Sequence, residues 1–100
     1  MPKRPMTEAE ARRIGAQLGI TWGDMAPGHV EPGQIDLEQF RRGLEVEFEH
    51  GSRDQQTNVT NDDPILTGKI AWAHLKEFPD YYARLDRLEA EADAYWTARR

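Results

Sequence analysis

The chain contains no cysteine, which excludes a disulfide framework, a thiolate metal site and a cysteine nucleophile. Its single serine, Ser52, lies in a polar stretch, which argues against a serine nucleophile. The sequence has neither a glycine-rich phosphate-binding loop nor a His-Glu-x-x-His pattern. Because these catalytic patterns are missing, we expect a protein that is not an enzyme.

Long apolar runs and net positive charge are also missing. No apolar run approaches the ~18 residues of a membrane-spanning helix, and the basic N-terminus is followed by a polar run instead of the apolar core of a signal peptide. We therefore expect a cytoplasmic protein without a membrane segment. The formal net charge is −5 at pH 7, whereas attraction to a nucleic-acid backbone needs a positive field. This balance argues against nucleic acid and favours a protein as the partner.

The residues that are present suit a compact helical protein. A length of 100 residues fits one domain over 1–100, and three each of Trp, Tyr and Phe supply bulky core material. No segment shows the period-two alternation of a strand, so we expect no sheet. Helical patterns extend over about 7–18, 36–50, 63–78 and 79–98. The predicted fold is all-α, a small four-helix bundle-like domain with two long loops.

Helix boundaries are marked by short-range signals. Thr7 and Glu10 have the spacing of a capping box, and Asp63 followed by Pro64 is typical of an N-cap and first helical residue. Pro79 ends the third helix and opens the fourth. In that last helix apolar residues recur at steps of three and four, the spacing of a bundle seam. We expect a buried seam there, or homo-oligomers formed through this C-terminal helix, with apolar positions at Tyr81, Leu85, Leu88 and Ala92.

Two Glu/His pairs suggest an alternative, a metal site. Glu47 and His50 are three residues apart in the second helix, and His74 and Glu77 in the third. Such pairs on facing helices build dinuclear metal sites in ferritin-like bundles. The four ligands can meet only if the two helices run parallel, because an antiparallel hairpin separates the histidines by roughly 15 Å. The first expectation is no cofactor, with His74 buried and hydrogen-bonded to Glu47 or Glu77; the alternative is a divalent metal.

The two long loops suggest a binding surface. Residues 21–34 carry Trp22 among glycines and prolines, and residues 52–63 are rich in Asn, Asp, Gln and Thr. A polar loop that buries no apolar area is ordered by hydrogen bonds or by a partner. Partner contacts are therefore predicted at Trp22, Asn58, Thr60 and Asp62. The same residues support a third hypothesis, a small-ligand or nucleotide binder.

A resemblance adds to these inferences. Between Asp36 and about Ala92, the chain resembles an uncharacterised family of small bacterial and phage proteins. The resemblance implies that the polar loop and His74 are family features, and it implies no activity. Together these observations predict a non-enzymatic protein-interaction module, such as a phage-encoded inhibitor or adaptor of a host protein. The motifs that carry the resemblance are Gly43-Leu44, Glu47, Glu49-His50-Gly51, Thr57-Asn58-Val59-Thr60, Asp62-Asp63-Pro64, Thr67-Gly68-Lys69, Ala73-His74-Leu75 and Pro79-Asp80-Tyr81-Tyr82.

Overall fold

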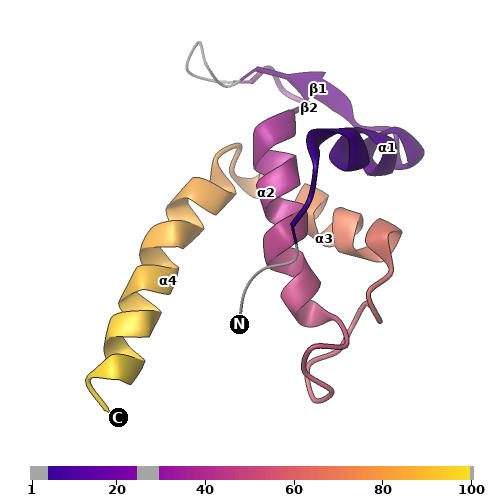
Figure 1. The fold of residues 1–100 in the computed structure, drawn as a ribbon. Helices are drawn as coiled ribbons and strands as arrows, with labels where there is room; N and C mark the ends of the chain where they lie inside the picture. The colour runs from indigo at the N-terminus through magenta and orange to yellow at the C-terminus, as the bar shows by residue number, and fades with distance from the viewer. Residues whose placement is uncertain (1–4, 25–29, 100) are drawn as a thin grey trace.

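The computed structural model describes residues 5–24 and 30–99, and within them the fold is mostly helical (Figure 1). Four α-helices lie where the sequence predicts them, and a short 3₁₀ helix extends the second. In chain order the elements are α1 (Glu8–Leu18), β1 (Thr21–Gly23), β2 (Gln34–Asp36), α2 (Leu37–Glu47), η1 (Phe48–His50), α3 (Pro64–Glu77) and α4 (Tyr81–Thr97). None of the helices in the described part is long and apolar enough to cross a membrane.

Local capping explains where the first three helices begin. The Thr7 hydroxyl accepts a hydrogen bond from the amide of Glu10, and the Glu10 carboxylate accepts one from the amide of Thr7, which is the predicted capping box. Asp36 accepts from the amide of Gln39 at the start of α2. Asp63 accepts from the first amides of α3, directly before Pro64. Each carboxylate also lies at the positive end of its helix dipole, which stabilises the helix start.

The expectation of no sheet is wrong. β1 and β2 form a two-stranded parallel sheet in which Trp22 pairs with Ile35. Each strand has only three residues, which is too short for alternation to stand out in the sequence. The pairing is instead held by tertiary contacts: Ile35 is buried, and the Trp22 ring packs against Phe40 with the ring centroids 5.6 Å apart.

The core forms where α1, α2 and α3 meet, and α3 runs across α2 (Figure 1). Two glycines permit the close packing of these helices. A methyl group on Gly43 of α2 would lie 3.0 Å from Cβ of Ala71 in α3 and 2.5 Å from Cε2 of Tyr82 in α4. A methyl group on Gly68 of α3 would lie 2.8 Å from Cγ2 of Ile14 in α1. Gly43 and Ala71 thus place small residues where α2 and α3 cross, and Gly68 makes room for side chains of α1 against α3.

Helix α4 departs from the predicted bundle. It leaves the body beside α2 and extends outward as an arm (Figure 1), and of its residues only Tyr82 is buried. Leu85 is half-buried against the core, but Leu88 is 59% exposed and Ala92 is exposed. The predicted buried seam is therefore wrong beyond Leu85. The radius of gyration, 14.2 Å, also exceeds the roughly 13 Å of a compact chain of this length.

Candidate functional site

A buried carboxylate lies at the junction of α2, α3 and α4. Glu47, at the end of α2, is 2% exposed, and its Oε2 accepts a hydrogen bond from the Tyr82 hydroxyl at 2.7 Å. Nδ1 of His74 lies 2.7 Å from the same oxygen. Because a carboxylate oxygen accepts, this contact assigns the proton of the imidazole to Nδ1. The predicted hydrogen bond between His74 and Glu47 is therefore present, although the His74 side chain is 29% exposed and only partly buried.

Aromatic packing holds this network in place. The ring of Tyr81 stacks on the His74 imidazole with centroids 4.3 Å apart and planes 6° apart, and Tyr82 meets the same imidazole edge-on. Burial, and then the hydrogen bond to Glu47, raises the pKa of the Tyr82 hydroxyl above its ordinary value of 10.0. Within the described residues, every buried side-chain nitrogen or oxygen has a hydrogen-bond partner. The network therefore ties three helices together.

The structure brings together three of the four predicted metal ligands. His50, in η1, places Nε2 3.3 Å from Oε1 of Glu47, so Glu47 lies between the two histidines. Glu77 is exposed near the end of α3. The crossing of α2 and α3 explains this arrangement, because it brings His74 to Glu47 without placing the helices side by side. Among the described residues, no group of three His, Asp or Glu side chains could hold a metal ion. The metal site stays a prediction without geometric support.

The polar loop is organised by its own side chains. Asp62 accepts hydrogen bonds from the amide and the hydroxyl of Ser52, which close the two ends of the loop. Asn58 accepts from the amide of Asn61, and the Thr60 hydroxyl accepts from the amide of Asp62. Asn61 and Asp62 have φ values of 50° and 65°, a left-handed conformation that Asn and Asp tolerate best among residues other than glycine.

The four residues predicted to contact a partner also make contacts within the protein itself. Thr60 is 1% exposed, so its side chain is covered by the protein itself. Asn58 and Asp62 contribute to the loop conformation, and Trp22 packs on Phe40 in the core. The partner contacts stay a prediction, and the structure gives each of these residues a structural role.

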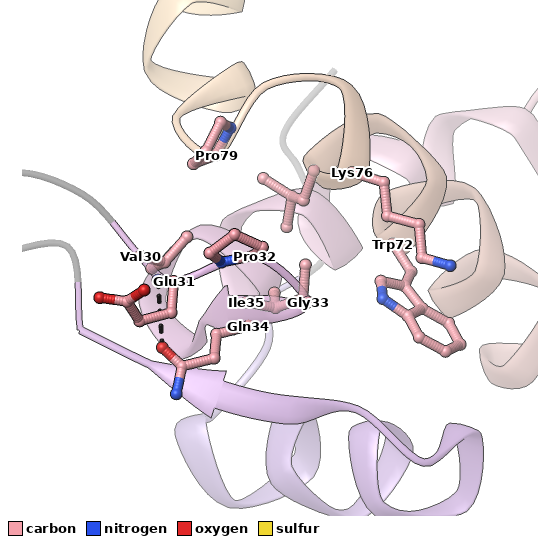
Figure 2. Close-up of a pocket in the computed structure, with 10 residues that line it drawn as sticks. Val30, Glu31, Pro32, Gly33, Gln34, Ile35, Trp72, Lys76 and Pro79 are labelled. Carbon is pink, nitrogen blue, oxygen red and sulfur yellow. Dashed lines mark hydrogen bonds between the residues drawn. The ribbon is translucent and has the colours of Figure 1, made fainter.

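A groove lies between β2, with the segment before it, and helix α3 (Figure 2). Its volume is about 420 Å³. Trp72 lies on the α3 side of the groove, across from Pro32, Lys76 extends from α3 with its ammonium beside Trp72, and Pro79 closes one end (Figure 2). The lining is largely apolar: Val30, Glu31, Pro32, Gly33, Gln34, Ile35, Trp72, Leu75, Lys76 and Pro79.

Two charges of opposite sign lie on this groove. The ammonium of Lys76 sits 4.5 Å from the centroid of the Trp72 ring, in a cation–π contact. Glu31 lies on the opposite wall, where its amide donates to the side chain of Gln34. The groove therefore combines an apolar floor with a positive charge fixed beside an aromatic face.

No pattern in the sequence predicted this groove. The sequence nevertheless contains a sign of it, because the helix at 63–78 is apolar on nearly all sides, whereas contact with one core requires only one apolar face. In the structure Ala71 and Leu75 are buried in the core, and Trp72, on another face, lines the groove. The opposite wall comes from the segment before β2, which no spacing in the sequence connects to Trp72.

The comparisons with known proteins place the chain in a family. Residues 11–91 match the model of a family described as protein of unknown function (DUF5661). No curated protein and no solved structure matches the chain. The match covers the core helices and most of α4, including Glu47, His74 and the groove. The chain therefore belongs to DUF5661, a family of proteins of unknown function.

Proposed function

We propose that this protein is a non-enzymatic protein-interaction module of the cytoplasm, and that it binds an extended segment of a partner protein in the groove between β2 and α3. The groove itself carries the proposal. A concave, mostly apolar surface with a few placed polar groups is the usual form of a binding site. The bacterial or phage origin implied by the resemblance fits an adaptor or inhibitor of a host protein, and it stays a prediction.

The shape of the groove favours an extended segment as its occupant. Among the described residues, β2 has a strand partner, β1, on one side only, and the groove is bounded by β2 and α3 and not by β1. An edge strand can accept an added strand through its backbone, with specificity supplied by pockets for alternate side chains. The floor at Ile35 and Leu75 is suited to an aliphatic or aromatic side chain of the partner.

The positive charge of Lys76 should favour extended segments that carry an acidic residue. Lys76 lies at the groove on α3, and burial of the contact would strengthen its attraction to a carboxylate of the partner. The expected segment therefore carries one bulky apolar residue with Asp or Glu close to it.

The test uses synthetic peptides of about seven residues, enough to extend along the groove at ~3.4 Å per residue. One set carries Leu or Phe two positions from Asp, a second carries Lys in place of Asp, and a third carries Ala in place of the apolar residue. Binding is measured by chemical-shift perturbation of the Trp72 indole signal. We expect the first set alone to bind, with shifts confined to the groove.

Matched variants decide whether the groove is responsible. Lys76→Glu should weaken binding about tenfold, the effect of roughly 1.4 kcal/mol. Lys69→Glu is the control, because Lys69 is exposed on the same helix and does not line the groove. Equal binding of acidic and basic peptides, or equal loss in the two lysine variants, would overturn the proposal.

A small ligand is the second candidate, because the groove volume lies within the roughly 300–1,000 Å³ of small-molecule sites. A thermal-shift screen would test it. A compound that raises Tm in the native chain and not in Trp72→Ala, together with no peptide binding, would favour this alternative.

A further inference from the structure

Helix α4 carries an apolar seam beside the face that packs on the body. The body partly covers Tyr81 and Leu85 at the start of the seam, and the seam residues after them are exposed. Tyr82 and Asp86 face the body, where the Asp86 carboxylate accepts from Arg42 of α2. About a quarter-turn away, apolar residues recur at steps of three and four over the whole helix, the a/d spacing of a coiled coil. On α4 the seam consists of Tyr81, Leu85, Leu88, Ala92 and Tyr95, and Phe78 lies next to its start, in the segment before the helix.

The two halves of this seam have different shapes. The first half is a shallow groove of about 220 Å³, lined by Phe78, Tyr81, Arg84, Leu85 and Leu88. The second half bears two protruding aromatics, with Tyr95 48% and Trp96 59% exposed. These two rings pack edge to face, 5.0 Å apart. A groove at one end and a bulky knob at the other are complementary to each other.

We propose that α4 pairs with α4 of a second copy of this chain in an antiparallel, two-fold symmetric dimer. A two-fold interface uses the same patch on both copies, so the patch must be complementary to itself. Antiparallel pairing meets this condition, because it places the Tyr95 knob of each copy in the groove beside Phe78 of the other. In the same register Leu85 of one copy packs against Leu88 of the second, twice, at the centre.

Charge supports the antiparallel direction. Beside the seam, the first half of α4 carries Arg84, whose guanidinium also donates to Asp80 before the helix, and the second half carries Glu89 and Glu91. Antiparallel pairing sets Arg84 of each helix against the acidic flank of the other, whereas parallel pairing sets the acidic flanks together. Arg84 and Glu91 both flank the seam at equivalent heptad positions, so each Arg84 faces Glu91 of the second copy.

This dimer does not depend on the peptide groove of the proposed function, because the two surfaces share no lining residue. A single helix pair is small beside the ~1,600 Å² of a standard interface, so we expect a weak dimer. If both proposals hold, the protein presents two identical peptide grooves, which raises its avidity for a partner that carries repeated segments.

Sedimentation equilibrium from about 1 µM to about 1 mM tests the association. We expect a reversible dimer, and we expect Leu88→Glu to raise the dissociation constant at least about tenfold. The control is Ala90→Glu, an exposed change on the opposite face of α4, which should leave it unchanged. Circular dichroism checks that both variants fold. A monomer at every concentration, or equal effects of the two variants, would overturn the proposal.

Two further measurements test the direction. Arg84→Glu and Glu91→Arg should each weaken the dimer, and the double variant should restore it. Because the chain has no cysteine, a spin label on Thr97→Cys is unique. At 1.5 Å per residue the antiparallel register separates the two labels by about 30 Å, and parallel pairing brings them within about 15 Å. The short distance, or no rescue by the double variant, would refute the antiparallel arrangement.

Discussion

Removing one hydroxyl tests whether the buried network holds α4 to the body. In Tyr82→Phe, Glu47 loses the hydroxyl donor that lies 2.7 Å from Oε2, the same oxygen keeps its bond to His74, and the ring itself stays in place. A hydrogen bond to a charged group contributes about 1.5–3 kcal/mol. We therefore expect the free energy of unfolding to fall by about 2 kcal/mol, a large fraction of the ~5–15 kcal/mol of a typical domain.

Urea unfolding followed by far-UV circular dichroism measures this loss. With a slope of ~1–2 kcal/mol/M, the midpoint should fall by about 1–2 M. Tyr95→Phe is the matched control, since Tyr95 is half-exposed on the arm, and its midpoint should stay within the error. In a double-mutant cycle with Glu47→Gln, the coupling energy should exceed about 1 kcal/mol.

Two results would refute the reasoning. A fall in the free energy of unfolding below ~0.5 kcal/mol would show that water replaces the hydroxyl, and hence that water reaches the Glu47 carboxylate. A large loss with no coupling to Glu47→Gln would assign the effect to packing of the ring and not to the hydrogen bond.

Four other predictions follow from the structure. The pKa of Tyr82 is raised on folding, so its contribution to stability is complete below pH ~10 and declines at higher pH, where only the unfolded chain loses the proton. The free energy of unfolding, measured with urea, should therefore differ less between pH 8 and pH 11 in Tyr82→Phe than in the native chain. Gly43→Ala should cost about 1–3 kcal/mol, because its methyl group would overlap the Tyr82 ring, and thermal unfolding would show no change if the ring simply moves aside. Asp63→Ala should cost ~1 kcal/mol through the lost N-cap of α3, and a midpoint equal to wild type would contradict that. Elemental analysis of protein purified without chelator should find no bound divalent metal, and a stoichiometric metal that Glu47→Gln removes would revive the metal hypothesis.

Sequence by itself determined the helices, because their signals are local. The capping box at Thr7 and Glu10, and the Asp63–Pro64 pair, act over one turn and mark where helices begin whatever surrounds them. The sequence also predicted a hydrogen-bond partner for His74, since His74 and Glu47 lie on or beside apolar helix faces and a buried ionisable group needs a partner. It could not decide between Glu47 and Glu77 as that partner, because the choice depends on the angle between two helices.

Only the tertiary structure decided how these helices are arranged. The close approach of α2 and α3 depends on side chains that meet at Gly43, and that of α1 and α3 on side chains that meet at Gly68. No spacing within one helix encodes these contacts. Likewise, the seam of α4 has the same periodicity whether it is buried or exposed, so the pattern could not show that Leu88 faces solvent. The groove joins the segment before β2 to Trp72, about forty residues away in the chain. Periodicity reports which face of a helix is apolar, and the packing of the whole chain determines what, if anything, covers that face.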